Sequence, residues 1–272
     1  MTKTPDFLTR IIEQKRVRLD EARSLRSLAE MRVEALHVRG ASRPHALRAA
    51  LGGERGFNVI AEIKRASPSL GDIRRDAAPA EIALRYAAGG AAAISVLTEE
   101  DHFKGSLEDL REVRAATSLP LLRKDFIFDE WQLYEAAAAR ADALLLIVAA
   151  LDDATLARLR RIAEDELEMD ALVEVHTLAE LRRASACGAS VIGVNNRNLH
   201  NFEVSLETSV ELIGHAPAGA LLVSESGLRT HADLRRLHSL GYRGFLVGET
   251  LMRAGDPAEA LRALLSEESS GA

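Results

Sequence analysis

Lysine is scarce in this chain, and most positions that carry it are places where an amine could transfer a proton. Thirty of the 35 basic residues are arginine and five are lysine. Lys64, Lys104 and Lys124 each lie inside a motif-like segment. Arginine keeps its proton in proteins, whereas lysine can be tuned to release a proton and take it back. We therefore interpret Lys64 and Lys124 as candidate acids, with substitution bias as the alternative explanation of the count.

Carboxylate, amide and guanidinium side chains end other apolar segments in the same way. Glu62, Glu174, Asn195, Arg197 and Glu225 are the candidates. When amines and carboxylates lie close together in a site that excludes water, their pKa values shift toward neutral pH. Such groups can then work as acids and bases. The alternative is a structural network of ion pairs. The expectation that such groups gather at one end of the fold, with none at the opposite end, argues against that alternative.

The elements that must position these residues alternate regularly from about residue 57 onward. Short apolar segments, each fit for a buried strand, are separated by amphipathic helical patterns. The eight strand candidates are residues 57–63, 91–98, 119–125, 142–148, 170–175, 190–195, 220–225 and 244–249. This order predicts an α/β protein, a closed (β/α)8 TIM barrel, and the absence of a GxGxxG turn disfavours an open sheet.

One domain is expected for residues 1–272, with the barrel over residues 57–265. Residues 1–50 have helical periodicity and many charges, so they are predicted to form an N-terminal helical extension packed on the barrel. Parallel barrels place their chemistry where strands end. Strand side chains alternate faces, so Glu62 and Lys64 point the same way, and Lys124 shares the inward face of Leu122.

A second pattern indicates phosphate binding. SESG (224–227) follows the seventh strand candidate, and GETLMR (248–253) follows the eighth. Small residues at these places let backbone N–H groups and a helix N-terminus face an anion, the usual phosphate site of this fold. The alternative is that these glycines only make turns.

Composition and missing motifs exclude several other classes. The net charge of -6 and pI near 5.8 disfavour nucleic-acid binding. The eight histidines show no metal-ligand spacing, so no metal and no cofactor are expected. Cys187, the single cysteine, reads as a packed thiol and fits a reducing cytoplasm. No secretory signal is seen, and the longest apolar run, residues 143–151, is too short for a membrane span.

Taken together, these segments resemble the indole-3-glycerol phosphate synthase family over nearly the whole chain. Eight motifs occur in the family's order. They are AEIKRASPS (61–69), SVLTEEDHFKGS (95–106), LLRKDFIFDEWQLYEA (121–136), ALLLIV (143–148), LVEVHT (172–177), IGVNNRNL (192–199), VSESGL (223–228) and FLVGETLMR (245–253). The resemblance implies ring closure, decarboxylation and dehydration of 1-(2-carboxyphenylamino)-1-deoxyribulose 5-phosphate in tryptophan biosynthesis, which makes the chain a carbon–carbon lyase.

The resemblance also implies roles for individual residues. Lys124 would be the acid that protonates the ketone and Glu174 the base, with Lys64 binding substrate or acting as the alternative acid and Glu62 holding a lysine in place. The implied catalytic set is Lys124, Glu174, Lys64, Glu62, Asn195 and Glu225. The implied substrate-binding set is Ser67, Phe103, Phe126, Leu146, Arg197, Ser226, Gly227, Gly248 and Glu249, with Phe103, Phe126, Leu146 and the loop 67–69 around the anthranilate ring.

The chain departs from the family's pattern in a few places. Leu70 stands where the family often has a lysine, which bears on loop closure, Trp131 replaces a common tyrosine, and Glu249 replaces a serine found in some members. The implied partner is a small phosphorylated substrate for a cytoplasmic monomer that associates at most with neighbouring tryptophan-pathway enzymes. The alternatives are another phosphate-binding barrel enzyme, such as a phosphoribosylanthranilate isomerase-like protein, and a non-catalytic barrel that binds a phosphorylated metabolite.

Overall fold

The eight expected strands form a closed parallel barrel, as predicted. The computed structural model describes residues 7–53, 56–68, 71–74, 76–199 and 201–266. The barrel strands are β1 (Asn58–Ile63), β4 (Ala93–Leu97), β5 (Leu121–Lys124), β6 (Ala143–Ile147), β7 (Asp170–Val175), β8 (Val191–Asn195), β9 (Leu221–Glu225) and β10 (Gly244–Val247). Neighbours in sequence are neighbours in the barrel, and β1 closes the ring by pairing with both β4 and β10.

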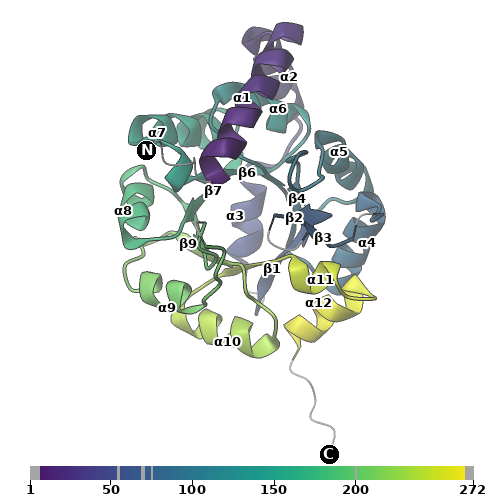
Figure 1. Cartoon of the computed structure of the whole chain (residues 1–272), viewed down its shortest axis with the longest axis vertical. Helices are drawn as coiled ribbons and strands as arrows, with labels where there is room; N and C mark the ends of the chain where they lie inside the picture. The colour runs from purple at the N-terminus through teal and green to yellow at the C-terminus, as the bar shows by residue number, and fades with distance from the viewer. Residues whose placement is uncertain (1–6, 54–55, 69–70, 75, 200, 267–272) are drawn as a thin grey trace, which may run out of the picture.

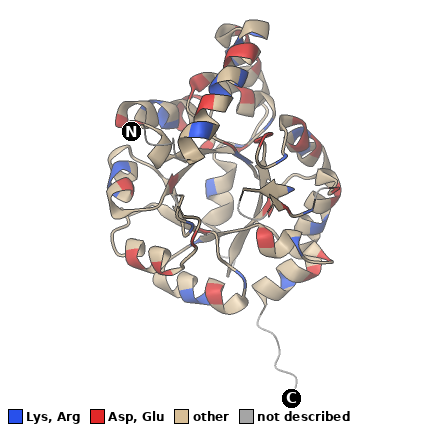
Figure 2. Ribbon diagram, viewed as in Figure 1, with Lys and Arg blue, Asp and Glu red and all other residues tan. Residues whose placement is uncertain are grey.

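Helices cover the outside of the barrel, as Figure 1 shows. They are α4 (Pro79–Gly89), α5 (Leu107–Ala116), α6 (Glu130–Ala138), α7 (Asp153–Arg161), α8 (Leu178–Ala186), α9 (Glu207–Ile213), α10 (His231–Leu240), α11 (Glu249–Met252) and α12 (Pro257–Leu265). Several begin at a short polar residue whose side chain accepts a backbone N–H: Ser106, Asp129, Asp152, Thr177 and Thr230. Acidic and basic residues are interspersed over this outer layer (Figure 2).

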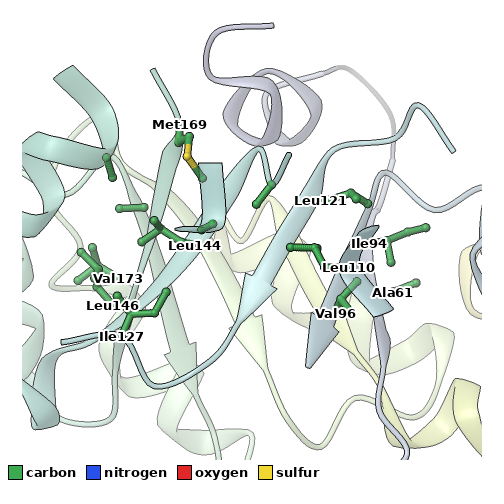
Figure 3. Packing of buried hydrophobic residues seen from close by; sticks show 14 of the residues in the cluster. Ala61, Ile94, Val96, Leu110, Leu121, Ile127, Leu144, Leu146, Met169 and Val173 are labelled. Atoms are coloured by element: carbon green, nitrogen blue, oxygen red, sulfur yellow. The ribbon is translucent and has the colours of Figure 1, made fainter. Parts of the chain in front are cut away.

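Strand alternation divides the core into two apolar clusters. The inner cluster fills the barrel and includes Ile60, Leu122 and Leu172. The outer cluster lies between strands and helices, and Figure 3 shows part of it around Leu144, Leu146 and Val173. Successive residues of one strand therefore belong to different clusters, which decides which side chains reach the barrel mouth.

Three helices precede the barrel: α1 (Phe7–Leu25), α2 (Leu28–Arg39) and α3 (Ala46–Leu51). The first two project from one side of the ring in Figure 1, while α3 lies at its centre. Leu47 and Leu51 of α3 belong to the inner cluster, and the Leu51 carbonyl accepts from Asn58 at the start of β1. This helix therefore closes the N-terminal end of the barrel, and the open end is the C-terminal one.

The N-terminal ends of the strands also carry buried carboxylates, contrary to expectation. Asp170 begins β7 and accepts from the Arg48 amide at 2.8 Å, with the His45 ring 3.3 Å away. Asp142, just before β6, pairs with Arg114 at 2.8 Å. The physical reason is that α3 and the strand starts leave N–H groups and guanidinium groups there that need buried acceptors. The position of a carboxylate alone therefore does not mark the functional end.

The first loop after β1 holds a small antiparallel hairpin that the sequence patterns did not indicate. Its strands are β2 (Ala66–Ser67) and β3 (Gly71–Asp72), with Ser67 opposite Gly71. Ser69 and Leu70, which come between these two strands in the sequence, lie outside the described residues. Within the described ranges, no helix is long and apolar enough to cross a membrane.

Candidate active site

A cavity of about 410 Å³ lies at the C-terminal ends of the barrel strands. Five of its charged lining residues lie on four different strands or directly after β1: Glu62, Lys64, Lys124, Glu174 and Glu225. Apolar side chains complete the lining from the strands, the loops and the start of α1. Groups far apart in the sequence are therefore brought to one enclosed place, as in other barrels of this kind.

Lys124 lies at the centre of the charged cluster. Its Nζ donates to Glu174 Oε2 and to Glu225 Oε2, both at 2.9 Å. Both carboxylates are buried, being 2% and 1% exposed. Burial alone lowers the pKa of the Lys124 amine, but Glu174 and Glu225 raise it more, so the pKa lies above the ordinary value of lysine. The amine is therefore a cation at neutral pH.

The pKa values of the two carboxylates bonded to Lys124 are shifted in opposite directions. Burial raises the pKa of Glu174, but Lys124 and His176 lower it more, so this carboxyl is held well below its usual range. Burial raises the pKa of Glu225 to about 7, since Glu174 next to it offsets part of the help from Lys124. Oε1 of Glu225 has no partner among the described residues and lies against Gly193, where an added Cβ would overlap it. When the pKa values of two neighbouring carboxyl groups differ in this way, the one with the lower pKa can act as a base and the other can carry a proton.

Lys64 forms a second amine–carboxylate pair beside the first. Its Nζ donates to Glu62 Oε1 at 2.6 Å. Of the two lysines, Lys64 is the one that hydrogen-bonds to Glu62. Gly248 lies against Glu62 so closely that an added Cβ would overlap the carboxylate. The glycine is therefore required by this close approach.

Another part of the cavity wall is built from backbone and small side chains. Ser226 and Gly227 both have positive φ, at 67° and 84°. Ser226 Oγ donates to Asn195 Oδ1 at 2.9 Å, and the Arg197 amide donates to the same oxygen at 3.0 Å. Gly248 directly precedes α11. This curved backbone resembles the anion-binding nests found in other proteins.

Comparison with known proteins decides the family. The model of a family described as indole-3-glycerol phosphate synthase matches residues 8–264. A protein of that name from Polaromonas naphthalenivorans is 47% identical over 264 residues, 96% of this chain and 99% of the relative. Another, from Leptothrix cholodnii, is 46% identical over the same length and coverage. The chain belongs to the indole-3-glycerol phosphate synthase family. The expected lyase activity in tryptophan biosynthesis is thereby confirmed.

Solved structures outside the family share the fold alone. An N-acetylmannosamine-6-phosphate 2-epimerase from Clostridium perfringens aligns with a TM-score of 0.60 at 16% identity, over 78% of this chain and 93% of that one. A thiamine phosphate pyrophosphorylase from Pyrococcus furiosus aligns with a TM-score of 0.57 at 19% identity, over 77% and 94%. The barrel is thus shared with proteins far from the indole-3-glycerol phosphate synthase family in sequence.

The structure brings together all but one of the residues that the resemblance implied. The cavity is lined by Glu62, Lys64, Ser67, Phe103, Lys124, Phe126, Glu174, Asn195, Arg197, Glu225, Ser226, Gly227, Gly248 and Glu249. The rings of Phe103 and Phe126 lie 6.2 Å apart, centroid to centroid, and form an aromatic wall. Ser67 has an Oγ without a hydrogen-bond partner among the described residues.

Leu146 is the exception, and its assignment to the ring pocket is wrong. Leu146 is fully buried in the outer cluster, near Val173 and Ile127 in Figure 3. Its neighbours Leu145 and Ile147 line the cavity instead. On an alternating strand, inward residues are two apart, so β6 presents Leu145 and Ile147 to the barrel and Leu146 to the helices.

Sequence reasoning also missed several residues at or near the site. Phe7 and Leu8 of α1 line the cavity, and the Phe7 ring contacts Phe202, with centroids 5.6 Å apart. No motif marked these residues. His176 was also missed, although it stands two residues after Glu174, directly after β7, and contacts that carboxylate. Cys187 has its Sγ bonded to the Ala184 carbonyl at 3.1 Å and lies outside the cavity lining, in line with its interpretation as a packed thiol.

Proposed function

We propose that Lys124 and Glu174 are the acid and the base with which this chain converts 1-(2-carboxyphenylamino)-1-deoxyribulose 5-phosphate to indole-3-glycerol phosphate, CO2 and water. The observation that carries the assignment is the single amine bonded at 2.9 Å to two buried carboxylates on the cavity floor. A binding protein would have no use for this arrangement, since burying like charges around one amine costs desolvation energy.

Ring closure needs an acid at the ketone oxygen. The Lys124 ammonium faces the developing alkoxide and stabilises its charge as the aromatic carbon attacks. An alkoxide is a stronger base than an amine, so the proton moves to the oxygen as the carbon–carbon bond forms. An arginine at this position would bind the oxygen but release no proton. Loss of CO2 from the attacking carbon then restores the aromatic ring.

Dehydration needs a base and a second proton donor. Glu174 is ionised and takes a proton from the methylene carbon beside the ring nitrogen, while the hydroxyl on the neighbouring carbon leaves as water after protonation by a lysine. Lys64 is less deeply buried than Lys124, and its one ion-pair partner among the described residues is Glu62, so it could bind substrate or supply this second proton. Glu62 also lies where negative charge would support a developing cation on the ring nitrogen. General acid–base catalysis of this kind contributes about 10²–10⁴-fold.

Substrate placement follows from the two sides of the cavity. The phosphate is assigned to the backbone N–H groups around Gly227, Gly248 and Glu249, with Ser226 and Lys64 beside them. The anthranilate ring is assigned to the wall of Phe103 and Phe126. Asn195 and Arg197 would contact the substrate hydroxyls and carboxylate. Because the reaction closes a ring within one molecule, holding both ends fixes a reactive conformer and accounts for much of the acceleration.

The test compares Lys124→Arg and Glu174→Gln with the parent in a fluorescence assay of indole-3-glycerol phosphate formation from synthetic substrate. Each variant should lose at least about 10²-fold in turnover. Phosphate binding, followed by competition with inorganic phosphate, should stay within a few-fold. Turnover at the parent rate in both variants would disprove the assignment.

We also infer a single barrel domain over residues 1–272, monomeric and cytoplasmic. The continuous family match and the bacterial biosynthetic relatives support this arrangement. Size-exclusion chromatography with light scattering tests the monomer, and a dimer mass would refute it.

A further inference from the structure

His176 contacts Glu174 at the end of β7. It follows β7 directly and is partly buried, with a side chain 10% exposed. It is absent from the cavity lining formed by the described residues, so it is not placed to touch substrate. The imidazole Nε2 lies 3.3 Å from Glu174 Oε1, an ion-pair contact, and this nitrogen makes no hydrogen bond to any of the described residues. Lys124 occupies the other oxygen of the same carboxylate.

The other side of the imidazole is fixed by α8. Nδ1 lies 3.1 Å from Glu180 Oε2, and the backbone N–H of His176 donates to the same oxygen at 2.7 Å. Thr177 begins the helix and accepts the Glu180 amide, at 3.2 Å. A glutamate at the third position of a helix usually accepts a hydrogen bond from the backbone N–H of the N-cap residue. Glu180 accepts instead from the backbone N–H of His176, the residue before the cap, and also contacts its ring. Together these two contacts hold the ring in one orientation.

We propose that His176 is a positioning residue that orients Glu174 and keeps it ionised as the catalytic base. The proposal rests on the assignment of Glu174 as base given above. An imidazolium between two carboxylates is stabilised by both charges, and here Nδ1 bonds Glu180 while Nε2 lies in ion-pair contact with Glu174. The direction of the His176 pKa agrees: burial lowers it, but Glu174 and Glu180 raise it to about 10.

The charged groups around His176 and Glu174 come from four further elements. Lys124 on β5 faces Glu174 directly, and Glu225 on β9 and Glu62 on β1 act on the same amine. Glu180 on α8 faces the imidazole. Lys124 is the stronger cation beside Glu174, but it must give up a proton during the reaction. His176 then remains the cation that keeps the base ionised.

Three variants separate the orientation from the charge. Glutamine places an amide nitrogen near the position of Nε2, so His176→Gln keeps a donor toward Glu174 but loses the charge. Asparagine mimics the Nδ1 side only, so His176→Asn keeps the Glu180 contact and leaves Glu174 without a donor. His176→Ala removes both. Circular dichroism and competition with inorganic phosphate check that each variant is folded with an intact phosphate site.

The readout is the pH profile of kcat and kcat/KM with the synthetic substrate. Glu174 works as a carboxylate, so activity is lost as pH falls through its pKa, and loss of a neighbouring cation moves this acid limb upward. We expect a shift of about 1–3 pH units in all three variants. The plateau kcat should fall about 10–100-fold in His176→Asn and His176→Ala, and less in His176→Gln. KM should change little.

Two outcomes would overturn the proposal. An acid limb that stays in place in every variant would show that His176 does not keep Glu174 ionised. Equal plateau losses in His176→Gln and His176→Asn would show that it does not orient Glu174. Glu174→Gln, measured in parallel, separates this from the proposed function. If Glu174→Gln turns over at the parent rate, Glu174 is not the base and the proposed function fails. If Glu174→Gln is inactive but the His176 variants behave like the parent, only the positioning role of His176 is refuted.

Discussion

A buried ion pair joins the N-terminal helix to Asp125, the residue next to Lys124. Lys15 of α1 is 6% exposed and Asp125 is 2% exposed, and Nζ lies 2.7 Å from Oδ1. Replacing Lys15 with methionine keeps most of the side-chain volume and removes the charge. Breaking a buried pair from one side costs about 3–5 kcal/mol, because the remaining charge is left without its partner.

The remaining contacts of Asp125 set the size of the effect. Oδ2 still accepts from Thr98 at 2.6 Å and from Arg123 at 3.1 Å. We therefore expect Lys15→Met to lower the free energy of unfolding by about 3 kcal/mol, the low end of that range. The double variant with Asp125→Asn should cost less than the two single variants together, because the pair interacts directly. Since Asp125 follows Lys124, kcat should fall more than KM changes.

Urea unfolding followed by circular dichroism, near neutral pH, measures the free energies. The matched control is Arg18→Met on the same helix. Arg18 pairs with Asp101 at 2.6 Å, but their side chains are 46% and 34% exposed, so the loss should be at most about 1 kcal/mol. A loss for Lys15→Met no larger than that of the control, or strict additivity with Asp125→Asn, would refute the reasoning.

Three further predictions concern the site. Leu145→Ala should raise KM, whereas Leu146→Ala should leave KM nearly unchanged and cost about 2–5 kcal/mol of stability, as kinetics and urea unfolding will show. The raised pKa of Glu225 stabilises the fold at low pH, and this contribution is lost as pH rises from about 4.5 toward 7. Glu225→Gln should flatten that part of the stability–pH curve; an unchanged slope contradicts it. Gly193→Ala should displace Glu225 and reduce kcat, with far-UV circular dichroism unchanged.

Much of the fold could be predicted because its signals are local. Eight short apolar segments alternate with amphipathic ones, and every barrel strand lies within two residues of its expected range. The side chain of Lys124 could be placed inward because Leu122 is two residues before it. The same rule, applied to β6, would have selected Leu145 over Leu146. That error arose because Leu146 was taken from the family motif without checking which residues of the strand point into the barrel.

What could not be predicted depends on contacts between distant segments. Phe7 reaches the cavity only because α1 lies across the barrel, and nothing near Phe7 in the sequence encodes that placement. Asp142 and Asp170 are buried at the opposite end because helices and strand starts need acceptors there. The local sequence shows whether a carboxylate lies at the start or the end of a strand. Whether that carboxylate has a structural role or a role in the reaction depends on the group it pairs with.

The distinction becomes clear when the partners of the buried carboxylates are compared. Asp170 accepts a backbone N–H and Asp142 pairs with an arginine, and neither of those donors releases a proton at neutral pH. Glu174 and Glu225 share a lysine, whose proton is transferable. One carboxylate more than the amine can neutralise leaves Glu225 with a raised pKa and Glu174 ionised. Replacing Lys124 by arginine would keep the charge balance of the cluster and remove its chemistry, which is why that substitution, rather than alanine, isolates the catalytic function.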